Sequence, residues 1–413
     1  MRAAPIAILI VSVLSAQVQP NEAKVPVGGG ELRYFYSASA AKAPLLVILP
    51  GVADDPGVRN LFAQWQLMAA SRGWNCVMPF ITGVSDQAVK ALELILADAK
   101  KRLAGVVNET SVYLAGQGAS SADVFYALSR EPDLWAAALA IQGSPGPAIN
   151  TFRLYGANTQ LAPLLWIAPP SELELYKAKL SAVEFNFEAR QEVKTDEAFD
   201  WLAKHQLPAF PATIDCETGS PTFAHCYWIE MTKFDPKKRN DVLKSSRVMA
   251  GSGAWLEVGP FGYDFLAPGP GAPVTYLPPN YQGPLKMNDR IVSIAGKEIR
   301  DGRDYARQMD EMKEAKSVAV MIQRGKDKVR LETKILLPKR EELVSARAQG
   351  RYLSDQKELL LITRAVTEMR VRVPVEWTPV SVSWNGLDMV KAESAGCWVL
   401  SIEKDPPGAV PCR

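Results

Sequence analysis

The sequence predicts a protein of mixed class, with a doubly wound α/β domain in its N-terminal half and a β-rich C-terminal half. Two features support this prediction. Over residues 25–212, short apolar runs typical of strands buried on both faces alternate with longer segments of helical periodicity. That alternation is typical of a parallel sheet covered by helices. From residue 213 onward, short segments separated by Gly and Pro turns predict antiparallel strands instead.

Each element of the N-terminal domain has its own signal. The run from Ala43 to Val52 is apolar and ends in Pro-Gly, as a buried strand does. The segment 85–105 begins with a Ser-Asp cap and continues as a long amphipathic helix. By the same criteria, the expected strands are 43–52, 75–81, 111–116, 136–143, 162–170 and 182–189, and the expected helices are 60–74, 85–105, one that begins near Ser120, 172–181 and 195–205.

The first part of the C-terminal half divides into two segments by composition. Residues 213–250 predict a lone strand at 223–231 followed by a charged linker. Residues 251–338 predict a module of short strands with one helix at 302–315.

Residues 339–413 are expected to form the last segment. It opens with a charged connector of helical composition at 339–355 and continues as a tail that alternates like exposed antiparallel strands. Trp384-Asn385-Gly386 contains the Asn-Gly signal of a tight hairpin turn. The sequence leaves open whether this tail is a domain of its own or part of the preceding module.

Length, charge and histidine content limit the function. A chain of 413 residues is too long for one core, so two or three domains are expected. The net charge of +2, without a basic stripe, argues against nucleic acid as a partner. Two histidines are too few for a His-rich metal centre, and no cysteine spacing is typical of zinc, so we expect no metal and no other cofactor.

The N-terminus has the features of an export signal. Arg2 is followed by an apolar run at 3–14 and then by Ser15 and Ala16. This pattern predicts a cleaved signal peptide at residues 1–16 and a secreted or periplasmic protein. An uncleaved anchor is the alternative, but about a dozen apolar residues are too few to cross a hydrocarbon core of ~30 Å. No other segment reaches spanning length, so we expect no membrane span in the mature chain.

Export permits disulfides, and the chain has five cysteines. Cys216 and Cys226 share one segment, Cys397 and Cys412 share another, and Cys76 lies among apolar residues. Pairing within each segment, with Cys76 buried and reduced, is the simplest of the possible arrangements.

One strand-turn-helix segment, residues 112–143, points to a known fold. Its turn has the letters GQGAS at residues 116–120, and its helix ends in SREPDLWAAALAIQG. The segment resembles the nucleophile elbow of the α/β-hydrolase family, specifically of secreted esterases and depolymerase-like enzymes, and the resemblance covers about half of the chain. That elbow reads G-x-S-x-G. Here Gly118 stands at the nucleophile position and Ser120 at the second glycine, so the turn is kept but the attacking atom is missing.

The other members of the family's catalytic triad are also missing at their expected positions. The family's histidine lies on the loop after the last strand, here 190–194, which contains none. At the acid position stand Ser171 and Glu172, and Glu172 is more simply explained as a charge at a helix N-terminus. His205 is expected at the solvated end of a helix. The resemblance therefore implies a chain with no catalytic residue.

An unorthodox constellation is the alternative. It would combine Ser120 or Ser121 with His225. Two residues past the apex, however, a serine lies on the first helical turn, where it more simply caps the helix. Asp54 and Asp55 also place negative charge beside the loop that would stabilise an oxyanion.

A second resemblance lies in residues 283–309, which are similar to the most recognisable stretch of a PDZ domain. Asn288 replaces that family's usual glycine and tolerates the left-handed conformation. The family's carboxylate-binding loop fits the letters PFGY at residues 260–263. The matching positions of the longer stretch are Leu285, Asp289, Ile291, Ile294 and Gly296.

The PDZ resemblance implies a ligand site at Phe261, Gly262 and Tyr263. Such a loop presents backbone N–H groups to the terminal carboxylate of a peptide, and the strand after it pairs with the peptide. Prolines in APGPGAP, residues 267–273, would keep that pairing edge short. The alternative is that the module only packs against its neighbours.

These observations favour an exported, non-catalytic protein that binds a peptide or protein C-terminus, or a wall component, through its PDZ-like module. One alternative is a secreted serine hydrolase, an esterase or peptidase, with an unorthodox catalytic site. Another is a purely structural role in which both domains serve an assembly.

Overall fold

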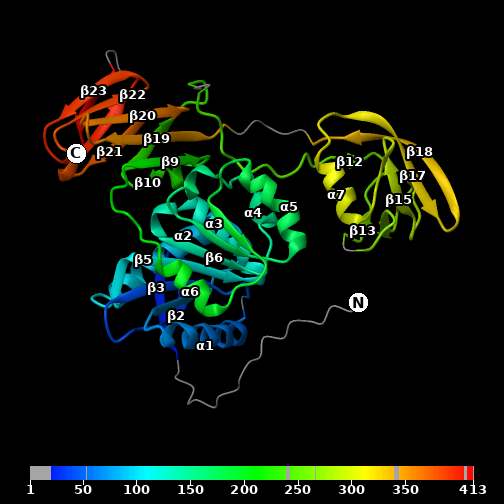
Figure 1. Ribbon diagram of the computed structural model, residues 1–413, viewed down its shortest axis with the longest axis horizontal. Helices are drawn as coiled ribbons and strands as arrows, with labels where there is room; N and C mark the ends of the chain where they lie inside the picture. The colour runs from blue at the N-terminus through cyan, green and yellow to red at the C-terminus, as the bar shows by residue number, and fades with distance from the viewer. Residues whose placement is uncertain are drawn as a thin grey trace.

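The computed structural model describes residues 20–52, 54–238, 242–265, 267–338, 344–403 and 407–412. The expected signal peptide lies outside these residues. The described chain forms three parts with separate cores: an α/β domain, a β-sandwich and a smaller β-rich module (Figure 1). In Figure 1 the sandwich lies to the upper left of the α/β domain and the module to its right.

The α/β domain is built on one eight-stranded sheet of order β1-β2-β4-β3-β5-β6-β7-β8. The β1/β2 and β2/β4 neighbours are antiparallel, and all others are parallel. The strands are β1 (Asn21–Val27), β2 (Gly30–Ser37), β3 (Ala43–Leu49), β4 (Asn75–Pro79), β5 (Val107–Gln117), β6 (Ala137–Ile141), β7 (Leu164–Ile167) and β8 (Phe187–Arg190). The helices are α1 (Asp55–Ser71), α2 (Asp86–Arg102), α3 (Ser121–Arg130), α4 (Gly146–Ile149), α5 (Pro170–Ser181) and α6 (Thr195–Ala203).

Helices cover both faces of this sheet, which confirms the doubly wound α/β prediction. Leu45 and Val47 of β3 pack into one core together with α2, α3 and α5. Leu46 and Ile48, which point to the opposite face, pack into a second core with α1 and α6. A strand buried on both sides needs apolar residues at every position, which is why these strands appear in the sequence as unbroken apolar runs.

The sandwich consists of two five-stranded sheets, of order β10-β11-β21-β24-β25 and β23-β22-β20-β19-β9. Two segments far apart in the sequence supply these strands, and their inner faces share one core. The first supplies β9 (Thr213–Thr218), β10 (His225–Cys226) and β11 (Ile229–Phe234); the second supplies β19 (Ala346–Leu353), β20 (Glu358–Arg364), β21 (Val366–Val373), β22 (Val380–Trp384), β23 (Leu387–Ala392), β24 (Gly396–Ser401) and β25 (Gly408–Pro411).

Three expectations for this region can be compared with the sandwich. The prediction of a lone strand at 223–231 is wrong, because Tyr227 (φ +54°) turns the chain and divides this segment between β10 and β11. The prediction of a helical connector at 339–355 is wrong for the described part of this segment, where β19 pairs with β9 and β20. Its period-two pattern places Ala346, Ala348 and Gly350 inside, and its arginines suggested a helix only by composition. The Asn-Gly hairpin between β22 and β23 is confirmed.

The module lies between these two segments in the sequence, so it is an insertion into the sandwich. Its sheet has the order β12-β18-β17-β15-β14-β13, with β16 beside β15, and its helix α7 packs on the core. The elements are β12 (Trp255–Leu256), β13 (Gly262–Tyr263), β14 (Ala272–Tyr276), β15 (Arg290–Ile294), β16 (Lys297–Glu298), α7 (Gly302–Asp310), β17 (Lys316–Arg324) and β18 (Asp327–Leu336).

Both expected disulfides are present: Cys216 pairs with Cys226, and Cys397 pairs with Cys412. Cys76 is buried and reduced, as expected. Within the described part of the chain, no helix is long and apolar enough to cross a membrane.

Candidate functional sites

The turn between β5 and α3 has the form of a nucleophile elbow without a nucleophile. β5 ends at Gln117, and α3 begins at Ser121 after a single 3-10 turn. Gly118, at the apex, has a φ of +63°, which other residues rarely adopt. A Cβ on Gly118 would meet no atom within 4 Å. The apex therefore has room for a side chain that the sequence does not supply.

The two serines beside the apex are bonded to the backbone of the turn. Ser120 Oγ accepts from Gln117 N at 2.9 Å and donates to Gln117 O at 3.0 Å. Ser121 Oγ donates to Ile141 O at 2.9 Å, which joins the turn to β6. Both side chains are fully buried. Their hydroxyls hold the turn together rather than cap α3, which corrects the expected capping role.

The histidine of the alternative constellation lies at the other end of α3. His225 Nδ1 is 2.8 Å from Asp133 Oδ2, and Asp133 follows α3 in the chain. The ten residues of α3, at 1.5 Å each, make a helix of about 15 Å. Ser120 and Ser121 lie at its start. The structure therefore does not bring His225 to either serine.

The remaining triad positions also lack the required groups. The segment 191–194, between β8 and α6, contains no histidine. His205 follows α6, and its ring lies 4.5 Å from that of Trp201. It is half-buried rather than solvated, and burial lowers its pKa. Glu172 lies in the first turn of α5, as expected.

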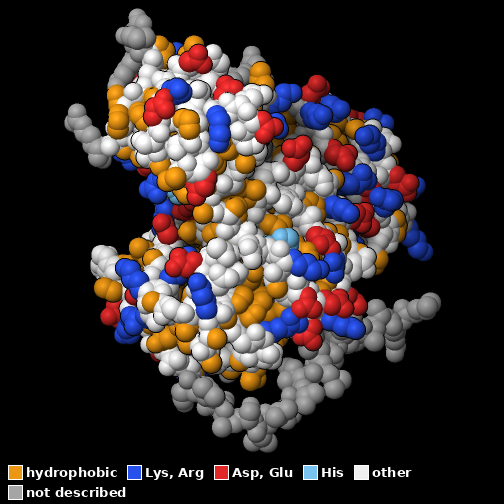
Figure 2. Space-filling view, turned by 60° about the vertical axis from the view of Figure 1, so that its left-hand side comes forward, with side chains coloured by type: hydrophobic (Ala, Val, Ile, Leu, Met, Phe, Trp, Pro, Cys, Tyr) orange, Lys and Arg blue, Asp and Glu red, His pale blue; other side chains and the backbone are white. Residues whose placement is uncertain are grey.

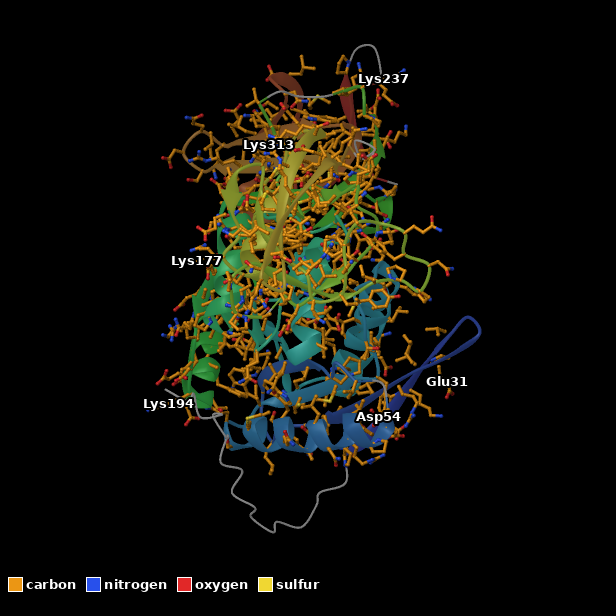
Figure 3. All side chains as sticks on the ribbon, turned by 90° about the vertical axis from the view of Figure 1, so that its right-hand side faces the viewer. Glu31, Asp54, Lys177, Lys194, Lys237 and Lys313 are labelled. Atoms are coloured by element: carbon orange, nitrogen blue, oxygen red, sulfur yellow. A yellow bond between two sulfur atoms is a disulfide. The ribbon has the colours of Figure 1, made fainter. Side chains whose placement is uncertain are left out.

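The loop after β3 carries less uncompensated charge than the sequence suggested. Asp54, labelled at the start of α1 in Figure 3, caps that helix by accepting from Gly57 N at 2.8 Å. Asp55 is paired with Arg33 at 3.0 Å and with Arg59 at 3.5 Å. These two arginines offset the negative charge beside the elbow.

We expect Gly118→Ser to fold and to hydrolyse esters no faster than the wild type does. The left-handed backbone would cost about 1–2 kcal/mol, but there is room for the side chain. With no imidazole within reach, the new hydroxyl is not activated. Hydrolysis of p-nitrophenyl acetate by the purified variant tests this, with Gly118→Ala as the control of equal backbone strain. A rise of about tenfold or more over both wild type and Gly118→Ala would show that a base reaches the apex.

The second candidate site is a groove of about 590 Å³ on the module, between its edge strand and its helix. Phe261 and Tyr263, two of the three residues expected to bind ligand, line it. Gly262 lies between them and faces Tyr276, since a Cβ there would be 3.0 Å from Tyr276 Cβ. The other lining residues are Ala254, Trp255, Leu256, Glu257, Gly259, Pro260, Tyr305, Ala306, Met309, Asp310 and Leu336.

The strand β13 is the last strand of its sheet, so its outer edge is unpaired among the described strands. Asp264 N donates to Pro273 O at 3.2 Å. Because hydrogen-bonded and non-bonded pairs alternate along an antiparallel ladder, the N–H and C=O of Tyr263 point to the outer edge. The helix α7 lies beside that edge, with the rings of Tyr263 and Tyr305 4.7 Å apart.

One neighbouring turn is bonded to the loop before β13, and a second turn, at Asn288 and Asp289, is fixed by its own contacts. Tyr281 Oη donates to Val258 O at 2.6 Å. Asn288 has a φ of +68°, as expected for a position that otherwise requires glycine. Asp289 accepts from Arg324 at 2.9 and 2.8 Å and from Lys286 N at 2.7 Å. Burial opposes ionisation of Asp289, but these donors hold its pKa below the usual range.

The sequence did not reveal the back wall of the groove, which β12 and the end of β18 form between β13 and α7. Trp255 and Leu256 are the whole of β12, so they are too few to show a strand period. A weaker signal was present on the helix, where Tyr305 and Met309 are one turn apart and both face the groove.

The rim of the groove bears two acidic side chains, each beside a lysine. Lys334 Nζ lies 3.8 Å from Glu257. Lys179 Nζ, on α5, lies 2.9 Å from Asp310 at the end of α7, so this ion pair joins the α/β domain to the module. Figure 3 shows this side of the molecule, with Lys177 of α5 labelled below Lys313 of the module.

No protein-family model matches the sequence, and no curated protein matches it. Solved structures similar to part of the chain include a thermostable esterase (16% identity, 45% of this chain and 62% of that chain, TM-score 0.34), a lipase/esterase from Lactobacillus plantarum (13%, 45% and 98%, 0.35) and the enterobactin esterase of Shigella flexneri (15%, 46% and 57%, 0.34). The matched part is the N-terminal half, which contains the eight-stranded sheet and its helices. Identities and TM-scores this low assign no activity.

Within the described residues, no group of three or more His, Cys, Asp or Glu side chains is placed to hold a metal ion.

Proposed function

We propose that the protein is exported and binds the C-terminal segment of a peptide or protein in the groove between β13 and α7. In this proposal the module acts as a PDZ-like domain and the α/β-hydrolase-like half is a non-catalytic scaffold. The observation that supports it most is the unpaired edge of β13 along a groove whose opposite wall is a helix. An extended peptide adds to such an edge by backbone hydrogen bonds.

The lining of the groove indicates the chemistry of the ligand. Most of its side chains are apolar or aromatic, which favours a large apolar residue at the peptide's end. Pro260 has no N–H and Gly262 is paired with Tyr276 of β14, so the donor that the strand directs toward a terminal carboxylate is the backbone N–H of Tyr263. The two acidic groups on the rim, Glu257 and Asp310, each lie beside a lysine, so they add no preference for a basic residue further along the peptide.

The proposal that the protein is non-catalytic rests on the turn between β5 and α3. Gly118 offers no nucleophile, and the hydroxyls of Ser120 and Ser121 are buried and bonded to the backbone. The alternative is a serine hydrolase with an unorthodox site, and the esterase structures are similar to part of this chain. A fluorophosphonate probe distinguishes the two, because stoichiometric labelling of Ser120 or Ser121 in the folded protein would overturn the non-catalytic proposal.

A library of decapeptides with free C-termini tests binding in the groove. We expect selection of peptides that end in a large apolar residue, and we expect amidation of the C-terminus to weaken binding at least about tenfold, since a charged hydrogen bond is lost. Ala306→Arg, which places a long side chain in the groove from the half-buried face of α7, should abolish binding. Ser317→Arg, on the exposed part of β17, is the matched control.

A second variant tests peptide binding at the loop itself. Gly262→Asp adds a carboxylate beside the loop N–H groups, but it also crowds Tyr276, so its folding must be checked by circular dichroism. Equal peptide binding by wild type and a folded Ala306→Arg would overturn the proposal. So would a library that yields no peptide above background.

A further inference from the structure

A separate pocket of about 300 Å³ lies on the sandwich, against the sheet that contains β10, β11, β21 and β24. Its lining residues are His225, Trp228, Ile229, Glu230, Arg370, Arg372, Cys397 and Cys412. On the face seen in Figure 2, the surface is hollowed between the sandwich above and the α/β domain below, and charged side chains of both signs gather there.

The strand register brings the charged residues onto one face of this sheet. Glu230 lies opposite both His225 and Arg370 on its neighbouring strands, and Arg372 lies opposite Cys397. Arg370 Nη1 is 2.9 Å from Glu230 Oε2, so these two charges offset each other. The exposed guanidinium of Arg372 has no ion pair with any described residue and remains as a positive charge in the pocket.

His225 is oriented toward the pocket from the side of the α/β domain. Its Nδ1 donates to Asp133 Oδ2 at 2.8 Å, and the same oxygen accepts from Tyr227 N at 3.2 Å. This pairing fixes the ring and leaves Nε2 for the pocket, which the half-exposed side chain lines. In its protonated form His225 therefore offers a second N–H donor near Arg372.

We propose that this pocket binds a small oxyanion, the carboxylate or phosphate group of a solute, between Arg372 and His225. The planar fork of an arginine presents paired N–H donors that match the oxygens of either group. Glu230 does not oppose the ligand, because Arg370 already compensates it. The volume suits a small solute and is too small for a folded partner.

Binding of the oxyanion is expected to depend on pH through His225. The hydrogen bond to Asp133 raises the pKa of His225, so the imidazolium persists above its usual range and is lost as pH rises further. Affinity for an anion is therefore high below this pKa and falls above it. Burial raises the pKa of Glu131 to about 7, but Lys90 Nζ lies 2.6 Å from its carboxylate and offsets the charge that Glu131 gains as pH rises. The groups that face His225 are Asp133, Glu131, Glu230, Arg372 and Tyr227.

Sulfate is a suitable probe because its charge is constant between pH 5 and 9. Only two histidines are present, so their NMR signals can be followed in the whole chain, with His205 as an internal reference. We expect sulfate to shift the signals of His225 and not those of His205, with a dissociation constant about tenfold or more weaker at pH 9 than at pH 6. Acetate as a parallel probe distinguishes a carboxylate ligand from a phosphate-like one.

Arg372→Gln should weaken sulfate binding at least about tenfold, because it removes a charge-assisted bidentate contact. The residue is exposed, so the variant should fold as the wild type does. Arg351→Gln, at an exposed position of β19 in the other sheet, is the matched control. The proposal is overturned if neither anion shifts His225, if Arg372→Gln binds sulfate as well as Arg351→Gln does, or if binding is unchanged between pH 6 and pH 9.

Discussion

Replacing Glu217 by alanine is expected to lower the free energy of unfolding of the sandwich by about 3–5 kcal/mol, the largest stability effect we foresee. Glu217 lies in β9 with a side chain that is 1% exposed. Its carboxylate accepts from Ser245 Oγ at 2.5 Å, from Ser246 N at 2.6 Å, from Ser246 Oγ at 2.7 Å and from Ser345 Oγ. Alanine would remove the acceptor of all four donors, of which the two of Ser246 and the one of Ser345 are buried.

The position of these donors in the chain explains why the effect should be large. Ser245 and Ser246 precede the inserted module, and Ser345 follows it. Glu217 therefore ties together the segments at which the chain leaves the sandwich and returns to it. Replacing this residue removes a buried contact that binds both ends of the insertion to β9, in addition to the pairing of β19 with β9.

Differential scanning calorimetry resolves the transitions of a multidomain chain and is the appropriate measurement. Glu393→Ala is the matched control, because Glu393 is 67% exposed and forms a surface ion pair with Lys391 at 3.0 Å. We expect that control to change stability by less than about 1 kcal/mol. A change for Glu217→Ala as small as that of Glu393→Ala would contradict the role assigned to the carboxylate.

The second large effect is expected from removing the Cys216–Cys226 disulfide. Cys216 lies in β9 and Cys226 in β10, so the bond joins the two sheets of the sandwich. The cysteines are 10 positions apart, and closing a loop of that length in the unfolded chain corresponds to about 2.5–3 kcal/mol. The double variant Cys216→Ala/Cys226→Ala should lose about this much stability.

Reductant provides the control for the disulfide prediction. It should lower the thermal midpoint of the wild-type sandwich more than that of the double variant, because only the wild type still has the bond between the sheets to lose. Cys397→Ala/Cys412→Ala is a matched variant that removes a bond within one sheet. If reductant lowered the thermal midpoint equally in the wild type and in Cys216→Ala/Cys226→Ala, the prediction would be contradicted.

The local features of the chain could be predicted because each depends on near neighbours in the sequence. Strands such as β3 are buried on both faces, so every position is apolar and the run is visible without any knowledge of its partners. Asn288 and the Asn385-Gly386 turn adopt the left-handed backbone that their residue types allow. The missing nucleophile at Gly118 is also a local fact, since the motif fixes where it should stand.

Features that depend on partners far away in the chain could not be predicted. β19 has polar outward residues and small inward ones, and its strand character follows from pairing with β9, more than a hundred residues earlier. The back wall of the groove combines the two-residue strand β12 with the end of β18, for the same reason.

The sequence by itself determined the strands and helices of the doubly wound domain, the missing nucleophile at Gly118 and the position of the loop at residues 261–263. The signal for each of these elements lies in a short stretch of residues. Only the tertiary structure decided that the module is inserted into a sandwich, that His225 pairs with Asp133 away from the elbow, and that Arg372 lines a pocket with it. The physical reason is that strand pairing and side-chain contacts between distant segments are selected by how the buried faces fit together, and no single segment contains that information.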